Sequence, residues 1–341
     1  MSRFRSVLFL PADNARAVDK ARGLDCDLAV LDLEDAVAPD RKAEARKAAV
    51  AALKTHPFAV RVNGLDTPWG ADDLAALAGT GVHVVVAPKV ESAANVIALA
   101  ERLSETARLW AMIETPRALR ALNVIAASGG PLRALMLGVN DLAKALGTGP
   151  SPDREPLKPW LAATVATARA HGLLAIDGVF NRFQDAEGFA AEAAQARLYG
   201  FDGKSLIHPS QIAPCHAAFA PTEAQVAFAR AVVAAFAAPD AADKGAIRVE
   251  GEMVERLHLE TAVALLAGLY NPSPLGGEGG SRSETDEGVS PIRNNYRPVS
   301  VSDTAPSSER LRRPPSPPRG EGSTTSSLVA PAAIDTPATP A

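Results

Sequence analysis

Two acidic residues, Glu114 and Asp141, each follow an apolar run of the kind that forms a buried strand. Carboxylates in such positions could bind a hard cation, Mg²⁺ or Mn²⁺. Mg²⁺ usually takes one or two protein carboxylates and completes its shell with waters and substrate oxygens. The alternative is that a carboxylate after a strand only caps the next helix. For Asp141, which precedes Leu142, the residue types alone leave both interpretations open.

Charged residues recur after other apolar runs of the chain. Glu34 and Asp35 follow Leu33, Arg61 stands within Val60-Arg61-Val62, and Lys89 follows Pro88. Such charges are costly if they cluster without partners, whereas acids, an arginine and a lysine around a cation and an anionic substrate balance one another. Because no Cys or His cluster accompanies them, oxygen ligands and Mg²⁺ are favoured over zinc. Lys89 could form a Schiff base, but beside a metal a charge-balancing role is favoured.

Three further polar features have structural interpretations. Asp177 precedes Gly178, a dipeptide typical of a turn. The charges over residues 41–47 are typical of a solvated helix face. His208 follows the last apolar run, where a structural role and a site role are equally compatible with the sequence.

A unit of strand followed by helix recurs along the first part of the chain. The strand candidates are largely continuous in hydrophobicity, as buried parallel strands are. They are Ser6–Ala12, Leu28–Glu34, Phe58–Asn63, His83–Lys89, Arg108–Glu114, Ala134–Asn140, Leu173–Val179 and Gly203–His208. Helical runs lie between them, and Ser92 and Thr222 are candidate N-caps.

Eight such units predict a (βα)₈ barrel of the TIM type, in which the chemistry lies at the carboxyl ends of the strands. An open doubly wound sheet is the alternative, and it would require a glycine-rich phosphate turn after the first strand. Leu10-Pro11-Ala12-Asp13-Asn14 is not such a turn. The barrel is therefore favoured.

Composition limits the partners of the chain. Lys and Arg number 35 and Asp and Glu number 39, giving a net charge of −4. This balance predicts binding neither to nucleic acid nor to a membrane surface. We find no apolar stretch of about 18 residues and no signal peptide, and the two cysteines, Cys26 and Cys215, make no disulfide framework. We expect a cytoplasmic protein with reduced thiols.

The composition changes near residue 270. Residues 1–240 hold the predicted catalytic barrel, and 241–269 are expected to form a short strand-helix extension that packs on a neighbouring subunit. Residues 270–341 are rich in Pro, Ser, Gly and Arg. Such a segment buries too little apolar surface to offset its ordering entropy, so we predict a disordered tail without function, with a Pro-rich docking segment as the alternative.

The ordered motifs of residues 3–268 resemble those of the citrate lyase β-subunit-like family of CoA-ester lyases, in the HpcH/HpaI aldolase superfamily. That family includes malyl-CoA, citramalyl-CoA and citryl-CoA lyases. The motifs are Arg5-Ser6-Val7-Leu8-Phe9-Leu10-Pro11, Asp32-Leu33-Glu34-Asp35-Ala36-Val37, Arg61-Val62-Asn63-Gly64, Pro88-Lys89-Val90-Glu91-Ser92, Ile113-Glu114-Thr115 and Gly200-Phe201-Asp202-Gly203-Lys204-Ser205-Leu206-Ile207-His208-Pro209.

The resemblance implies Mg²⁺ (or Mn²⁺), an acyl-CoA substrate and a homotrimer or homohexamer. Glu114 and Asp141 match the metal ligands of the family. Arg61 matches an arginine that binds the substrate carboxylate or the enolate. By the same resemblance, Phe9, Arg16 and Lys20 fall near the CoA contacts. Glu34 and Asp35 are expected to support the rim of the site or the waters of the metal.

One motif departs from the resemblance. In many lyases of the family, a motif after the barrel consists of Met, an aliphatic residue and an Asp that reaches a neighbouring subunit as acid or base. The matching residues here are Met253-Val254-Glu255, so Glu replaces Asp. A misplacement near 1 Å can cost about a hundredfold in rate. The resemblance implies a Mg²⁺-dependent carbon–carbon lyase of a short 3-hydroxyacyl-CoA, with Glu255 as acid/base in an altered geometry. The structural alternative for Glu255 is that it only caps the last helix. The alternatives are a thioesterase for the same esters, an aldolase for free keto acids, and a non-catalytic subunit of a lyase complex.

Overall fold

Eight parallel strands form a closed barrel in the computed structural model, which describes residues 4–241 and 243–270. Because β1 pairs with both β2 and β8, the sheet has no open edge, and the doubly wound alternative is excluded. The strands are β1 (Ser6–Pro11), β2 (Leu28–Asp32), β3 (Ala59–Arg61), β4 (Val84–Ala87), β5 (Arg108–Ile113), β6 (Leu132–Leu137), β7 (Leu174–Asp177) and β8 (Gly203–Leu206). All eight predicted strands are confirmed, most with shorter ends.

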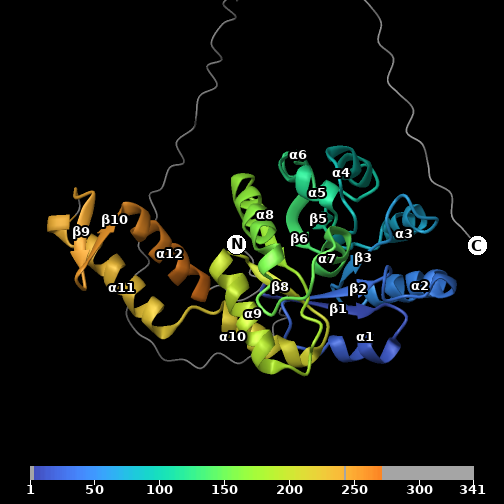
Figure 1. The fold of residues 1–341 in the computed structure, drawn as a ribbon, viewed down its shortest axis with the longest axis horizontal. Coiled ribbons are helices and arrows are strands. Elements are labelled where there is room, and N and C mark those ends of the chain that lie inside the picture. Colours follow the sequence, from blue (N-terminus) through green and yellow to red (C-terminus); the bar gives the residue numbers. More distant parts are fainter. Residues whose placement is uncertain (1–3, 242, 271–341) are drawn as a thin grey trace, which may run out of the picture. The chain divides into compact units, whose positions relative to one another are not determined.

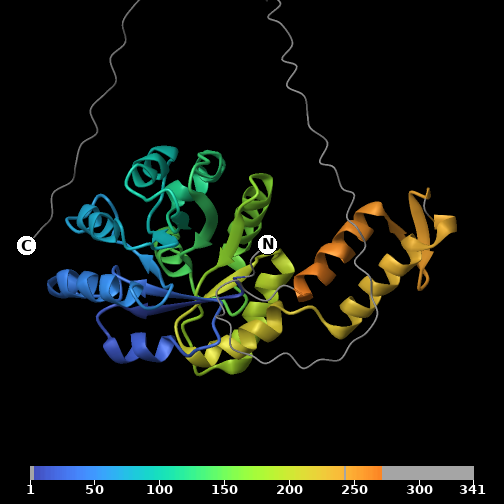
Figure 2. The ribbon, with the colours of Figure 1, turned by 180° about the vertical axis from the view of Figure 1, so that it is seen from behind.

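Helices surround the barrel on its outer side (Figures 1 and 2). Ser92 accepts a hydrogen bond from the Asn95 N–H as the N-cap of α4, so this predicted cap is confirmed. The helices are α1 (Ala15–Ala21), α2 (Lys42–Leu53), α3 (Gly70–Leu77), α4 (Ala93–Ala100), α5 (Pro116–Arg120), α6 (Leu122–Ala126), α7 (Val139–Leu146), α8 (Lys158–Ala170), α9 (Ala186–Tyr199) and α10 (Ile212–Phe219).

The strands have two apolar faces, and their alternation positions the site. One buried cluster fills the inside of the barrel and includes Val30, Trp110 and Met112, while a larger one lies between the strands and the helices. Because side chains alternate along a strand, the inward positions that follow Val30 and Met112 are Asp32 and Glu114. The inside of the barrel thus changes from apolar to polar at the carboxyl ends of the strands.

The sixth strand differs from its prediction in a way that matters for Asp141. β6 ends at Leu137 rather than at Asn140, and α7 begins at Val139. The N-cap of α7 is Gly138, and no side chain caps this end. Asp141 lies in the first turn of α7 without bonding to it, so the capping interpretation is wrong.

The segment after the barrel has an apolar cluster of its own. It contains α11 (Glu223–Ala237), the antiparallel hairpin of β9 (Ala246–Val249) and β10 (Glu252–Glu255), and α12 (Arg256–Tyr270). Thr222 caps α11, as predicted. Phe236, Val249 and Val254 share one cluster, so α11 packs with the segment that we assigned to the extension. The boundary at residue 240 and contact with a neighbouring subunit stay predictions, and residues 271–341, which hold nearly all of the expected tail, lie outside the described residues.

The helices and the cysteines of the described part of the chain bear on membrane spanning and on thiol reactivity. None of its helices is both long and apolar enough to span a membrane. Cys26 and Cys215 are free thiols, and burial raises the pKa of Cys26 to about 11 and that of Cys215 to about 12. Both thiols are therefore protonated at neutral pH, the state that reacts least.

Candidate active site

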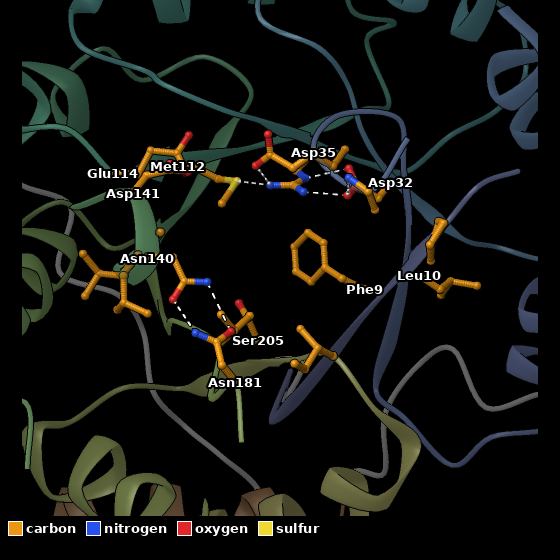
Figure 3. A pocket seen from close by; sticks show the side chains of 18 residues that line it. Phe9, Leu10, Asp32, Asp35, Met112, Glu114, Asn140, Asp141, Asn181 and Ser205 are labelled. Atoms are coloured by element: carbon orange, nitrogen blue, oxygen red, sulfur yellow. Dashed lines mark hydrogen bonds and ion pairs between the residues drawn. The ribbon is translucent and has the colours of Figure 1, made fainter. Parts of the chain in front are cut away.

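A cavity of about 450 Å³ lies at the carboxyl ends of the barrel strands (Figure 3). This volume is within the range of small-molecule sites. Five of the residues predicted from the sequence line it, and they come from different strand ends: Phe9, Asp35, Arg61, Glu114 and Asp141. The barrel therefore gathers in one pocket residues that are far apart in the chain.

Arg61 is held in the pocket by an acid that the sequence analysis did not select. Its Nε donates to Oδ1 of Asp32 at 2.7 Å and its Nη2 donates to Oδ2 at 2.6 Å. The guanidinium also lies 5.4 Å from the ring centroid of Phe9, as a cation–π contact. Burial opposes the charge of Arg61, but the hydrogen bonds and charge of Asp32 outweigh it and raise the pKa of the guanidinium. Arg61 is thus a fixed cation with a defined orientation.

Glu34 and Asp35 are neighbours with different environments. Glu34 is buried, with Oε1 2.6 Å from Nζ of Lys89 and Oε2 2.9 Å from Nη1 of Arg61. Burial raises the pKa of Glu34 against the opposing charges of Arg61 and Lys89. The Asp35 side chain is 58% exposed, and its carboxylate lies 3.6 Å from Arg61. Asp35 lines the cavity, whereas Glu34 joins the two cations beside it.

Glu114 is an almost completely buried acid of the cavity, with 1% of its surface exposed. Its Oε1 accepts a hydrogen bond of 2.7 Å from the Lys89 N–H. Lys89 has φ of +50°, a region that side chains rarely adopt, so its backbone is constrained where it meets Glu114. Burial, followed by the charge of Glu34, raises the pKa of Glu114 to about 7. A bound cation would favour the ionised form of this carboxyl.

The donor set fits Mg²⁺ better than a metal that needs many protein ligands. Among the described residues there is no group of three or more His, Cys, Asp or Glu side chains arranged around one metal position. Glu114 and Asp141 line the same cavity, and within the described part of the chain the Asp141 carboxylate has no hydrogen bond or ion pair. Two carboxylates with waters and substrate oxygens are a common Mg²⁺ environment.

Gly138 makes room for Glu114 at the start of α7. A Cβ atom at position 138 would lie 2.5 Å from the Cβ of Glu114, and its other nearest neighbours would be atoms of the same carboxyl group. Only a residue without a side chain at position 138 leaves room for Glu114. Position 138 is three residues before Asp141. Gly138 therefore allows Glu114 to keep its position in the cavity wall.

We expect Gly138→Ala to weaken Mg²⁺ binding by about 10- to 100-fold, the usual range for a change behind a metal ligand. The added methyl group would displace Glu114 without removing its charge. The increase in unfolding temperature with Mg²⁺ concentration measures the effect. Gly149→Ala is the matched control, because a Cβ at that position meets no atom within 4 Å. Equal Mg²⁺ affinity in both variants would contradict a role for Glu114 packing in metal binding.

Buried polar contacts position the loops that carry the acids. Nζ of Lys42 donates to the carbonyl oxygens of Leu33 and Glu34 and to Oδ1 of Asn63, each within 2.8 Å. Asn63 in turn donates its backbone N–H to Asp73 at 2.9 Å. The interpretation of residues 41–47 as a solvated helix face is therefore wrong for Lys42, which holds the β2 and β3 loops together.

A second charged cluster lies behind β7 and β8. Asp177 is fully buried, and its carboxylate accepts from Nζ of Lys204 at 2.7 Å and from Nη1 of Arg154 at 2.8 Å. Lys204 also donates to Glu192 of α9 at 2.7 Å. Burial alone would raise the pKa of Asp177, but the charges of Lys204 and Arg154 lower it. Asp177 is thus a structural ion-pair residue and more than a turn former.

The remaining candidates do not line the cavity of this chain. Arg16 and Lys20 are exposed on α1, and Glu255 ends β10. His208 is exposed and stacks on Phe183, with 4.7 Å between the ring centroids. Their predicted roles stay predictions, and that of Glu255 needs a neighbouring subunit.

Known proteins resemble this chain in sequence and in fold. The sequence model of the HpcH/HpaI aldolase/citrate lyase family matches residues 5–209. A (3S)-malyl-CoA thioesterase of Cereibacter sphaeroides is 44% identical, over 77% of this chain and 94% of its own. An L-malyl-CoA/β-methylmalyl-CoA lyase of the same species is 34% identical, over 77% and 93%. The crystal structure of CitE from Mycobacterium tuberculosis with magnesium, acetoacetate and coenzyme A aligns with a TM-score of 0.69 at 35% identity, over 79% of this chain and 99% of that one.

Proposed function

We propose that this chain, which belongs to the HpcH/HpaI aldolase/citrate lyase family, is a Mg²⁺-dependent lyase that cleaves a short 3-hydroxyacyl-CoA thioester. The products would be an α-keto acid and acetyl-CoA or a homologue. The observation that carries the proposal is the single cavity that contains Arg61, Glu114 and Asp141. Support comes from the relatives, whose names include malyl-CoA enzymes, and from a related structure that holds magnesium and coenzyme A.

The residues of the cavity suit the steps of this cleavage. A base takes the proton of the 3-hydroxyl group, the C2–C3 bond breaks, and its electron pair forms the thioester enolate, which is then protonated at C2. Arg61, oriented by Asp32, would stabilise the negative charge that develops on oxygen. When bound by Glu114 and Asp141, Mg²⁺ would supply Lewis-acid polarisation and orientation of the substrate carboxylate and its neighbouring oxygen.

Other residues have proposed roles around this centre. Asp35 is the carboxylate that faces the cavity with the most solvent access, so it can hold waters at the rim, with Glu34 supporting Lys89 and Arg61. Glu255 would act as acid/base from a neighbouring subunit of a homotrimer or homohexamer. Phe9, Arg16 and Lys20 would contact the CoA part of the substrate. Among these three, Phe9 lies in the cavity wall.

A second candidate is hydrolysis of the same thioesters. Sequence identity favours this reaction, because the malyl-CoA thioesterase is 44% identical to this chain, whereas the malyl-CoA lyase is 34% identical. In that reaction water adds across the acyl C–S bond, releasing free CoA thiol and a 3-hydroxy acid. The longer side chain of Glu255, where many lyases have Asp, is compatible with such a change.

Product analysis separates the two reactions. The protein is incubated with malyl-, citramalyl- and citryl-CoA, with Mg²⁺ or with a chelator, and keto acid, acetyl-CoA and free thiol are quantified. We expect keto acid and acetyl-CoA in equal amounts, formed only with Mg²⁺. Free thiol with hydroxy acid would instead identify a thioesterase. No turnover of any ester would support the non-catalytic subunit.

A further inference from the structure

The cavity has a charged side and a neutral side. Asp32, Arg61, Glu114 and Asp141 come from the ends of β2, β3, β5 and β6. The ends of β6 to β8 contribute uncharged polar groups, which are Asn140, Asn181 and Ser205. The end of β6 is the boundary between the two sides, because both Asn140 and Asp141 follow it. Because β6, β7 and β8 are consecutive in the sheet, these uncharged groups lie along one part of the wall. The two sides would bind chemically different parts of a substrate.

The two asparagines of the neutral side are bonded to each other. Nδ2 of Asn140 donates to Oδ1 of Asn181 at 3.2 Å, and Nδ2 of Asn181 donates to Oδ1 of Asn140 at 2.7 Å (Figure 3). This pair has no net charge, and each amide satisfies one donor and one acceptor of the other. It forms a polar wall that can meet an uncharged group without desolvating an ion.

Ser205 is different, because its hydroxyl is buried without a partner. The residue is 2% exposed, and within the described part of the chain its Oγ makes no hydrogen bond. It lines the cavity, and Leu206 beside it belongs to the outer cluster, so alternation turns Ser205 to the inside of the barrel. A buried hydroxyl without a partner is unfavourable and is rarely retained in proteins without a reason.

The other buried side-chain atoms without a hydrogen bond, among the residues described, have different explanations. Oε2 of Glu34 lies 2.9 Å from Nη1 of Arg61, so its charge is paired. Thr164 is on α8, outside the cavity. Ser205 is the member of this set whose residue lines the cavity, and its Oγ is an unsatisfied donor in the cavity wall. Its missing partner is therefore expected to arrive with the ligand.

We propose that the Ser205 hydroxyl donates a hydrogen bond to the thioester carbonyl oxygen of the bound acyl-CoA. This inference rests on the CoA-ester function proposed above. A carboxylate would be desolvated beside a neutral hydroxyl without a cation to balance it, whereas the charged side offers Arg61 and the metal position. The uncharged thioester carbonyl suits the neutral side.

The test compares two CoA compounds that differ in that carbonyl. Acetyl-CoA has it, and S-ethyl-CoA, a thioether, lacks it. Calorimetric titrations in the presence of Mg²⁺ give the dissociation constants for the wild type and for Ser205→Ala. We expect the wild type to bind acetyl-CoA about 3- to 10-fold more tightly than S-ethyl-CoA, as one neutral hydrogen bond allows. Ser205→Ala should bind both with the affinity of the wild type for S-ethyl-CoA.

Two controls make the result specific. Ser128→Ala removes a hydroxyl before β6, at the opposite end of the barrel. This variant should keep the preference of the wild type for acetyl-CoA over S-ethyl-CoA. The unfolding temperature of ligand-free Ser205→Ala should equal or exceed that of the wild type, because no hydrogen bond is lost. A lower temperature, or a preference that persists in Ser205→Ala, would overturn the inference and leave the CoA-ester function standing. Wild-type protein that binds neither compound would overturn both.

Discussion

Replacing Glu114 with glutamine is expected to lower Mg²⁺-dependent turnover by at least about a hundredfold, because a Lewis-acid cation supplies several kcal/mol of transition-state stabilisation. The amide keeps the shape of the side chain and its acceptor for the Lys89 N–H. It loses the charge that attracts the cation. The barrel should stay folded, since removing one buried charge relieves desolvation. Turnover at increasing Mg²⁺ concentration, together with circular dichroism, measures both effects. Full activity in this variant would refute the proposed metal site.

The same substitution predicts a change in the pH dependence of stability. Without metal, the pKa of Glu114 is raised from 4.5 to about 7 in the folded protein. Between these values the folded protein holds a proton that the unfolded chain has lost, so the Glu114 contribution to the free energy of unfolding decreases as pH rises. At the proposed site Mg²⁺ would bind the ionised form, and its affinity should fall as pH drops below about 7.

Chemical denaturation in a chelator, from pH 4.5 to 7, tests this. The difference in unfolding free energy between Glu114→Gln and wild type should grow with pH in favour of the variant. Comparing the two proteins cancels the carboxyls that do not interact with Glu114, including Asp177, whose lowered pKa makes stability fall at acid pH. Parallel curves would show that Glu114 does not titrate in this range.

The fold and the charged half of the site were accessible from the sequence because they depend on local patterns. Continuous apolar runs predicted all eight strands, and residues next to the strand ends predicted Arg61, Glu114 and Asp141 as cavity residues. Asp32 was missed because three acids, at positions 32, 34 and 35, follow one another closely. Only the register of β2 against β3, which pairs Asp32 with Arg61, selects the partner.

The sequence did not predict which charged side chains are buried, and the contacts of these side chains explain why. Lysine side chains are usually exposed. The ammonium groups of Lys42 and Lys204 are instead buried, and they bond to atoms 21 and 27 residues away in the chain. A pattern of neighbours cannot report such distant partners. The neutral side was missed for a related reason, since a serine within an apolar strand has no signature until the cavity and its missing partner are seen.

We also expect Arg61→Met to lower the free energy of unfolding by about 3–5 kcal/mol and to abolish turnover. Asp32 has a side chain that is 2% exposed, and loss of Arg61 would leave that buried carboxylate without its cation, a change that typically costs this much. Backbone N–H groups of Glu34 and Ala36 still bond to Asp32, at 2.8 and 3.1 Å, and would compensate only in part. Denaturant titration measures the loss.

Adding Asp32→Asn to Arg61→Met separates the structural role of this pair from its chemical role. The amide removes the unpaired charge, so most of the lost stability should return, because replacing both partners of a buried pair costs far less than removing one. Turnover should not return, since no guanidinium faces the cavity to stabilise negative charge on the substrate. Mg²⁺ should still raise the unfolding temperature of the double variant, because Glu114 and Asp141 are unchanged. Recovery of turnover in a refolded double variant would mean that Arg61 serves the fold alone, and the charge stabilisation assigned to it would have to come from another group in the cavity.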